Sequence, residues 1–298
     1  MKTRPYLLHA LTPLHAGTGQ SVGVIDLPLA RARATGMPLV PGSSVKGVLR
    51  EARSPEDRKD KGGPDLFAVF GPPSGDADLH AGALSVTDAR LLALPVRSFL
   101  GTFAWVTSPL LLRLARADLG DAAPAGVPKR PAEAVPGDPW AVIGAKTPHR
   151  GSHRGKLYLE DVDIRIAGHD PAVDAWAQWL AGLISAAAPD ACSERFVVVD
   201  DETMTFLYET AMQIDTRVRI DRETGTVAKG ALWTEESLPP ETVLLGLLVA
   251  ERTRRKGIDL DADTVLNEAL SKEEVLQFGG KATVGRGRCR IVPVGAGS

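Results

Sequence analysis

Residues 11–50 read LTPLHAGTGQSVGVIDLPLARARATGMPLVPGSSVKGVLR, and this stretch decides the predicted fold and site. It opens with a long loop that contains Gly17 and Gly19. Glycines lack side chains, so the backbone amides beside them can approach a phosphate closely. His15 and Asp26 belong to the same loop, which lets the two side chains converge. The loop is therefore a candidate anion-binding and catalytic segment.

The end of this stretch, from Pro41, predicts a helix. Ser43 or Ser44 can cap the first amides, and the open amides with the positive end of the helix dipole favour an anion there. Lys46 and Arg50 add positive charge in the first turns. The Gly-x-x-x-x-Gly-Lys-Ser/Thr spacing of a nucleotide P-loop is absent. Ordinary turn glycines with a capped helix remain the alternative interpretation.

A second glycine-rich stretch, FGGKATVGRGRCRI, occupies residues 278–291. Gly279 and Gly280 open it, and no acidic residue interrupts it. Arginine can fork onto phosphates or stack on bases, so cations without counter-charges favour binding of a nucleic acid over an edge hairpin with a solvated basic face. The basic residues of the stretch are Lys281, Arg286, Arg288 and Arg290.

A hairpin is predicted over residues 217–239, with its turn at residues 223–225. Bases can stack on an exposed indole, and carboxylates beside cations more often form surface ion pairs. Its candidate binding residues are Arg217, Arg219 and Trp233, and its acidic pair is Glu235 and Glu236.

Residues 120–155 are rich in Pro, Gly and Ala and end in a basic run. Because strand-like and helix-like patterns resume on both sides, we predict a basic loop insertion within one domain that spans residues 1–298. Arg150 and Arg154 in this loop are candidate contacts to a phosphate backbone, and an unstructured loop is the alternative.

The remaining patterns alternate between strands and helices without the rhythm of a barrel. Alternating apolar residues predict a strand over residues 157–166, and Asp170 before Pro171 predicts a capped helix that runs to residue 187. Residues 241–252 fit a buried strand or a helix equally well. We therefore expect an α+β sheet protein with large insertions.

The net charge, the number of cysteines and the apolar runs of the sequence exclude several classes of protein. The chain has 298 residues, with 35 Lys and Arg against 37 Asp and Glu, so its formal charge of −2 excludes a wholly basic surface but permits a local basic groove. Its 2 cysteines are too few for a disulfide framework or a zinc site. Because no long apolar run occurs, we expect a cytoplasmic protein without a signal peptide or membrane span.

Four blocks in order resemble one family. LTPLHAGTGQSVGVIDLPLAR (11–31), VPGSSVKGVLR (40–50), VRIDRETGTVAKGALWTEESLP (218–239) and FGGKATVGRGRCRI (278–291) look like the RAMP-superfamily backbone subunit (subunit four) of type III-B CRISPR effector complexes, the Cmr complexes. The resemblance covers nearly the whole chain, and it is weakest in residues 120–155.

The resemblance implies an RRM-like (ferredoxin-like) palm with large insertions, and a projecting thumb hairpin over residues 200–240. Copies would associate head to tail with other Cmr subunits, bind CRISPR RNA by its backbone, and cleave complementary target RNA at regular intervals. Cleavage would use Mg²⁺ or another divalent cation. Asp26 stands at the place of the essential acidic residue, to hold the metal or position the nucleophile. His15 matches a neighbouring histidine, and Glu235 or Glu236 matches acidic thumb residues.

Two alternatives stay open. The first is a catalytically inert RNA-binding scaffold subunit, since the motifs for RNA binding are better represented than those for chemistry. The second is a guide-processing RAMP ribonuclease that uses His15 as a base without metal. Cleavage of repeat RNA by the isolated chain in EDTA would distinguish it.

Overall fold

The computed structural model describes residues 1–19, 25–53, 66–72, 80–135, 137–145, 149, 151–185 and 189–295. Its α-helices are α1 (Gly42–Ala52), α2 (Leu66–Phe70), α3 (Pro109–Leu119), α4 (Pro171–Ile184), α5 (Pro189–Ser193), α6 (Asp201–Thr210) and α7 (Ala262–Ala269). Short 3₁₀ turns lie at Gly120–Ala122 and Ala282–Val284. Its strands are β1 (Lys2–Ala10), β2 (Leu39–Val40), β3 (Leu84–Val86), β4 (Ala89–Ser98), β5 (Thr102–Thr107), β6 (Trp140–Ile143), β7 (Ser152–His153), β8 (Lys156–Leu159), β9 (Val162–His169), β10 (Phe196–Val199), β11 (Gln213–Ile220), β12 (Val227–Ser237), β13 (Val243–Ala250), β14 (Glu274–Gln277) and β15 (Arg288–Pro293).

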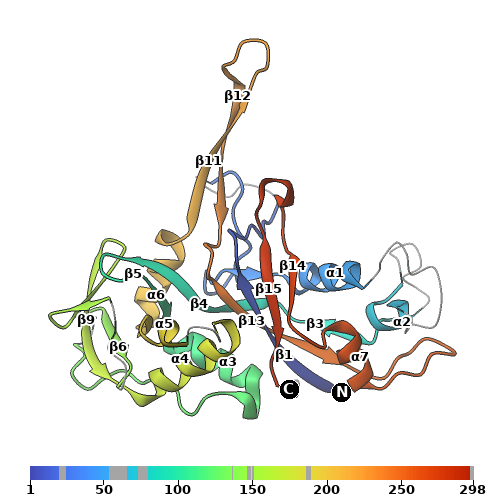
Figure 1. The fold of residues 1–298 in the computed structure, drawn as a ribbon, viewed down its shortest axis with the longest axis horizontal. Helices are drawn as coiled ribbons and strands as arrows, with labels where there is room; N and C mark the ends of the chain where they lie inside the picture. Colours follow the sequence, from blue (N-terminus) through green and yellow to red (C-terminus); the bar gives the residue numbers. More distant parts are fainter. Residues whose placement is uncertain are drawn as a thin grey trace.

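A single 13-stranded sheet connects the described residues from one end of the molecule to the other. Its main path runs β14-β15-β1-β13-β4-β5-β10-β6-β9-β8-β7, with β2 on β4 and β3 on β13. Figure 1 shows β6 and β9 at one end of the elongated body and α1, α2 and α7 at the other. The mixed α and β class predicted from the sequence is confirmed. None of the described helices combines the length and apolar character needed to cross a membrane.

Helices cover both faces of the sheet, which explains the continuous apolar sequence of β10 and β13. In β1, Leu7 packs into one hydrophobic cluster with α3 and α4. Its neighbours Tyr6 and Leu8 point to the opposite face and pack with α1, α6 and α7. Successive side chains of a strand alternate between faces, so a strand buried on both sides loses its polar positions. The same reasoning makes residues 243–250 a strand, although their sequence period is ambiguous.

Two helices begin at side-chain caps, and the cap at Asp170 confirms the sequence prediction. The Ser108 side chain accepts a hydrogen bond from the Leu111 amide at the start of α3, and Asp170 accepts one from the Ala172 amide at the start of α4. The predicted serine cap of α1 is wrong, because Pro41 precedes the helix and no side chain caps it. The Asp88 carboxylate instead accepts the Gly42 amide at 2.8 Å.

Two segments differ from the sequence prediction. Within the supposed insertion, Trp140–Ile143 forms the buried strand β6, which pairs with β10 and β9 inside the main sheet. Four apolar residues between proline and glycine were too short a pattern to be recognised as a strand. Residues 157–166 form two strands, β8 and β9, because Glu160 turns the chain with a φ of 48°.

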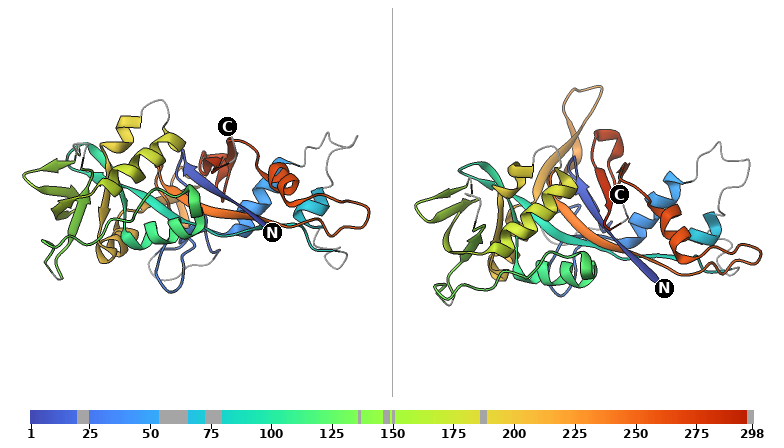
Figure 2. Two further views of the ribbon diagram at one scale, coloured as in Figure 1. Left: turned by 90° about the horizontal axis from the view of Figure 1, so that it is seen from below. Right: turned by 60° about the horizontal axis from the view of Figure 1, so that its bottom comes forward.

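A two-stranded hairpin, β11 and β12, stands away from the body (Figure 1, Figure 2). Directly paired residues share a face of such a hairpin. One face carries exposed apolar side chains, including Val218 paired with Leu232. The other carries charged and aromatic groups, including Arg217 paired with Trp233. The predicted hairpin is therefore confirmed, and its two faces differ in chemistry.

Candidate functional site

The two glycine-rich stretches meet in space. The Gly280 amide donates to the His15 carbonyl at 3.0 Å, and the Gly287 amide donates to the Pro13 carbonyl at 2.8 Å. The amides of Leu11 and Thr12 donate to the Arg288 carbonyl. We call residues 11–17 together with residues 278–288 the terminal junction. Its backbone hydrogen bonds hold the two stretches of chain together directly below the base of the hairpin.

Glycine is required at two positions of the terminal junction. Gly279 has a φ of +68°, and a Cβ there would lie 2.3 Å from the His15 carbonyl oxygen. A Cβ at Gly17 would lie 2.5 Å from Nε2 of His15. Real Cβ atoms do not approach other atoms this closely, so these glycines permit contact between chain segments. Gly19 has a positive φ of 85° and is exposed at the edge of the described loop.

The His15 imidazole is buried in the terminal junction, with 7% of its surface exposed. Its Nδ1 lies 2.6 Å from the Glu236 carbonyl oxygen. A carbonyl oxygen only accepts, so Nδ1 carries the proton and Nε2 is the acceptor of this ring. That acceptor faces Gly17. The ring therefore links the loop to β12.

Asp26 is exposed and is attached to the hairpin. Its Oδ2 accepts from the Thr234 amide at 2.8 Å and from the Thr234 hydroxyl at 3.1 Å. The Asp26 amide donates in return to the Thr234 Oγ1 at 3.2 Å. Next to it, the Leu27 amide donates to the Thr234 carbonyl and the Glu236 amide donates to the Leu27 carbonyl. The loop thus continues along the outer edge of β12 as a short parallel segment.

The Glu235 carboxylate is buried among cations, with 3% of its side chain exposed. Oε1 lies 2.7 Å from Lys281 Nζ and accepts from the Trp233 indole at 2.7 Å. Oε2 lies 3.5 Å from Nε of Arg217. Burial alone raises the pKa of the Glu235 carboxyl, but the hydrogen bonds from Lys281 and Trp233 and the charges of Lys281 and Arg217 outweigh it, so the pKa is lowered.

Glu236 points to the opposite face of β12 and is also buried. One carboxylate oxygen pairs with the Arg31 guanidinium, and the other accepts from the Leu29 amide at 2.9 Å. Both oxygens are occupied by the loop that carries Asp26. We therefore assign Glu236 to holding this loop on β12, in place of the predicted catalytic role.

Arg286 is a second correction, because its side chain is 7% exposed rather than available to RNA. Its guanidinium pairs with Asp215 at 2.6 Å and donates to the Ser237 hydroxyl at 2.9 Å. These partners lie on the two strands of the hairpin. Arg286 therefore fixes the hairpin base to the terminal junction. By contrast, Arg288 and Arg219 are exposed.

The basic residues of α1 contact protein groups. Lys46 donates to the Leu84 carbonyl at 2.8 Å, and its burial, with Arg50 nearby, lowers its pKa. The Arg50 guanidinium lies over the Phe67 ring at 5.6 Å. Ser43 is exposed and Ser44 is half-buried. None of these observations tests RNA binding by α1, which stays a prediction.

The described residues 151–155 of the basic loop lie at the far end of the main sheet. Arg154 is exposed in the turn between β7 and β8. The structure therefore separates Arg154 from the terminal junction. Arg150 lies outside the described residues.

Sequence analysis missed four residues of the site, namely Thr234, Asp215, Ser237 and Arg31. Neutral or paired polar residues carry no distinctive motif. The signal that could have found Thr234 is its place in β12, one residue before Glu235 and on the opposite face. Its pairing with the loop still depends on tertiary contact.

The groups around Asp26 offer few ligands to a divalent cation. Mg²⁺ is commonly held by one or two carboxylates together with waters and substrate phosphates. Asp26 offers Oδ1, which no described residue hydrogen-bonds, whereas Glu235 is occupied by Lys281 and Arg217. In the described part of the chain, no three His, Cys, Asp or Glu side chains gather into a metal site. The residues fit an ion that arrives with an RNA phosphate, and they do not form a closed cage.

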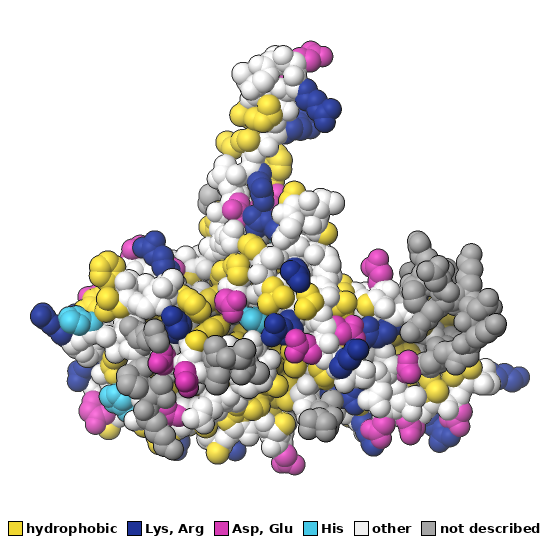
Figure 3. Space-filling view, viewed as in Figure 1, with side chains coloured by type: hydrophobic (Ala, Val, Ile, Leu, Met, Phe, Trp, Pro, Cys, Tyr) yellow, Lys and Arg dark blue, Asp and Glu magenta, His cyan; other side chains and the backbone are white. Residues whose placement is uncertain are grey.

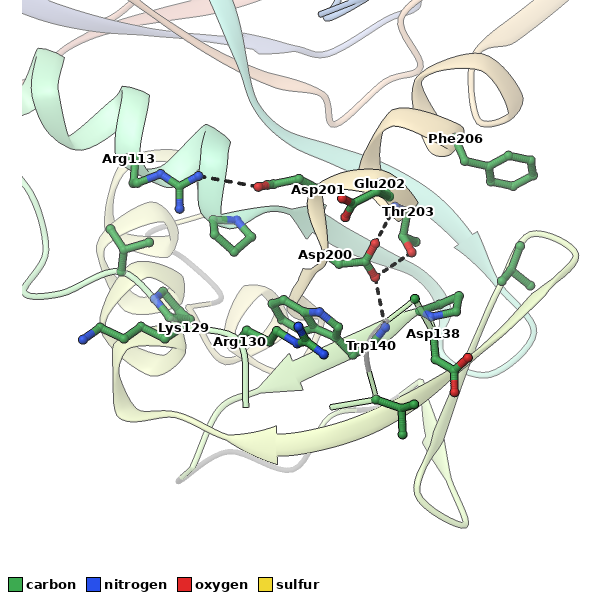
Figure 4. Close-up of a pocket in the computed structure, with 17 residues that line it drawn as sticks. Arg113, Lys129, Arg130, Asp138, Trp140, Asp200, Asp201, Glu202, Thr203 and Phe206 are labelled. Carbon is green, nitrogen blue, oxygen red and sulfur yellow. Dashed lines mark hydrogen bonds and ion pairs between the residues drawn. The ribbon is translucent and has the colours of Figure 1, made fainter. Parts of the chain in front are cut away.

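A cavity of about 860 Å³ lies elsewhere, between α3, α6 and residues 127–140 (Figure 4). Two of its carboxylates have structural roles. Asp200 accepts from the amides of Thr203 and Trp140, and Asp201 pairs with Arg113. Asp200 and Asp201 therefore hold α6 and β6 in place. Asp26 does not line the cavity.

Comparison with known proteins identifies the class. The sequence profile of the RAMP superfamily matches residues 7–290. The CRISPR system Cmr endoribonuclease Cmr4 of Pyrococcus furiosus is 33% identical over 287 residues, covering 95% of this chain and 93% of that protein. The chain belongs to the RAMP superfamily and, within it, to the family of the Cmr4 subunits.

Solved structures agree with this assignment. The crystal structure of oligomeric Cmr4 from Pyrococcus furiosus has a TM-score of 0.71 and 26% identity, covering 99% of this chain and 98% of that one. A chain in the cryo-EM structure of the type III-B Cmr-beta complex bound to cognate target RNA has a TM-score of 0.72 and 21% identity, with 99% and 98% covered. At that identity the second likeness supports the fold alone.

Replacing Glu235 by Gln should destabilise the protein at neutral pH more than at acidic pH. A carboxyl whose folded pKa is lowered contributes stability above its unfolded pKa and loses it as the pH falls through the folded pKa. Urea midpoints of both proteins from about pH 7 to about pH 3.5 should therefore converge toward the acidic end. The control is Glu209→Gln, at an exposed position of α6. A constant gap across the range would contradict the ionic role of Glu235.

Arg286→Gln should lower the free energy of unfolding by about 1–3 kcal/mol, because the buried Ser237 hydroxyl and the Asp215 carboxylate lose their partner. The matched change Arg288→Gln, at an exposed position two residues away, should alter it by less than about 0.5 kcal/mol. Chemical denaturation measures both values. Equal effects of the two changes would show that Arg286 does not hold the hairpin base.

Proposed function

We propose that this chain is a repeated backbone subunit of a cytoplasmic type III-B CRISPR ribonucleoprotein, which binds CRISPR RNA and cleaves complementary target RNA. The observation that carries the proposal is the exposed Asp26 carboxylate, attached to the projecting hairpin beside the terminal junction. The relative that is 33% identical is named an endoribonuclease, which supports a nuclease role.

In this proposal the body of the sheet is the RRM-like palm and the hairpin β11–β12 is the thumb. The thumb separates stretches of the guide–target duplex at regular steps, and each subunit cuts beside its own thumb. Repetition requires head-to-tail contact between copies and contact with other Cmr subunits. The oligomeric crystal form of the related Cmr4 supports such self-association.

Guide binding must be independent of sequence, since one protein serves many guides. Contacts to phosphates supply such affinity without reading bases. The exposed side chains of Arg219 and Arg288 provide these contacts. Hydrophobic and basic side chains gather along the hairpin (Figure 3), which suits stacking of bases on one side and phosphate contact on the other.

Cleavage needs an activated 2′-hydroxyl or water, neutralised phosphate charge and an in-line geometry. Asp26 Oδ1 is placed to position the nucleophile or to bind a hydrated cation. When bound, such a cation supplies charge neutralisation and activates the nucleophile. Arg217 and Lys281 pair with Glu235 on the other face of β12, so they are not assigned to this step.

His15 is assigned to positioning in this mechanism. Its ring is 7% exposed and its Nε2 lies against Gly17, so a substrate hydroxyl has little access to the nitrogen that a metal-free general base would use. This favours target cleavage by the assembled complex over guide processing by the isolated chain.

Asp26→Asn should abolish cleavage of matched target RNA by the assembled complex while guide binding stays unchanged. The amide keeps the size of the side chain and its acceptor for Thr234 but removes the negative charge. Gel analysis of labelled target with Mg²⁺, and with EDTA as a second condition, measures the products. The matched control is Asp161→Asn, an exposed residue between β8 and β9 at the far end of the sheet.

Full cleavage by the Asp26→Asn complex would end the catalytic assignment. Absence of evenly spaced products from the unmodified complex would instead favour the inert scaffold subunit. Cleavage that persists in EDTA would contradict the cation requirement.

Arg219→Gln and Arg288→Gln should each weaken guide binding and reduce the slope of log affinity against log salt by about 0.7, as expected for one lost phosphate contact to a single strand. Filter binding across a salt series measures the slope. Arg165→Gln, an exposed change on β9, should leave it unchanged. An unaltered slope for Arg288→Gln would show that the terminal junction does not contact the guide.

A further inference from the structure

Thr234 lies on the apolar face of the hairpin, and its hydroxyl donates a hydrogen bond to the Asp26 carboxylate. No other side chain of β11 or β12 does so among the contacts of the described residues. Thr234 and Asp26 make three hydrogen bonds with each other, two to Oδ2 and one from the Asp26 amide. A hydroxyl can accept one hydrogen bond while it donates another, so this pattern satisfies all the groups involved. The carboxylate is thereby held by one oxygen, and no described residue hydrogen-bonds the other.

This arrangement ties the orientation of Asp26 to β12. The backbone hydrogen bonds between Leu27 and β12 at Thr234 and Glu236 fix the register of the loop. They leave the Asp26 side chain free to rotate about its own bonds. Among the described residues, the Thr234 amide and hydroxyl alone restrict that rotation, and of these two donors the hydroxyl is the one that depends on the identity of the side chain.

We propose that Thr234 is a positioning residue for target-RNA cleavage, which keeps the open oxygen of Asp26 in the direction required for the reaction. The inference rests on the proposed function of Asp26. It makes the hairpin part of the cleavage apparatus, because a displacement of β12 moves the carboxylate with it. Thr234 itself touches neither substrate nor cation in this account.

The chain contains a matched control for this role. Thr216 lies directly opposite Thr234 on β11, on the same face of the hairpin, and is exposed. Its side chain makes no hydrogen bond to Asp26 among the contacts of the described residues. Thr216→Val therefore repeats the chemical change of Thr234→Val without removing a contact to the carboxylate.

The experiment compares Thr234→Val, Thr234→Ser, Thr216→Val and Asp26→Asn in the assembled complex. Valine has the shape of threonine and favours strands, so the hairpin should keep its stability. Thr234→Val should reduce the single-turnover cleavage rate about 10- to 100-fold, the cost expected for a misplaced catalytic group. Thr234→Ser should restore the rate to within about threefold, since it keeps the hydroxyl. Thr216→Val should cleave like the unmodified complex.

Target affinity, product positions and the melting temperature are measured for every variant, because a purely structural role would change them. They should remain unchanged in Thr234→Val. Normal cleavage by Thr234→Val beside an inactive Asp26→Asn would overturn the positioning role and leave the proposed function intact. Equal loss in Thr234→Val and Thr234→Ser would also overturn it. Normal cleavage by Asp26→Asn would instead refute the proposed function.

Discussion

The base of the hairpin is held by buried ion pairs, and the candidate site depends on them. Glu235 and Glu236 are neighbours in β12, so their side chains point to opposite faces. Lys281 from the terminal junction pairs with Glu235, and Arg31 from the loop pairs with Glu236. Ion pairs from both ends of the chain therefore hold the hairpin on both of its faces. This arrangement places Asp26 at the hairpin edge.

Such pairs define geometry more than they add stability. Removing charges from water costs free energy, which close pairing and additional hydrogen bonds offset only in part. A hydrophobic contact of similar size would attach the hairpin as strongly but would tolerate sliding and rotation. Arg286 shows the difference, because it reaches Asp215 on β11 and Ser237 on β12 at once. A group that must meet acceptors on both strands permits one orientation of the hairpin.

The sequence predicted what local patterns determine. The capping residue Asp170 acts within a few positions of itself, so its effect can be predicted from the local sequence. The sequence could not predict which arginine is buried. Arg286 and Arg288 are separated by a single glycine, and only the position of Asp215 decides which one is enclosed. The sequence also did not predict the short strand β6. Its neighbours in the sheet, β10 and β9, lie elsewhere in the sequence, so no local pattern shows the pairing.

Because Arg286 is buried and Arg288 is exposed, the positive charges of the terminal junction have two different functions. A cluster of cations in a sequence indicates a polyanion site only if the cations face solvent. Here Lys281 and Arg286 neutralise the carboxylates of the hairpin, whereas Arg288 remains exposed. The affinity of the junction for a phosphate backbone must then come from few side-chain charges, because the Gly280 and Gly287 amides already donate to the His15 and Pro13 carbonyls. Contacts to phosphates carry no sequence information, so this surface can follow an RNA strand without selecting its sequence.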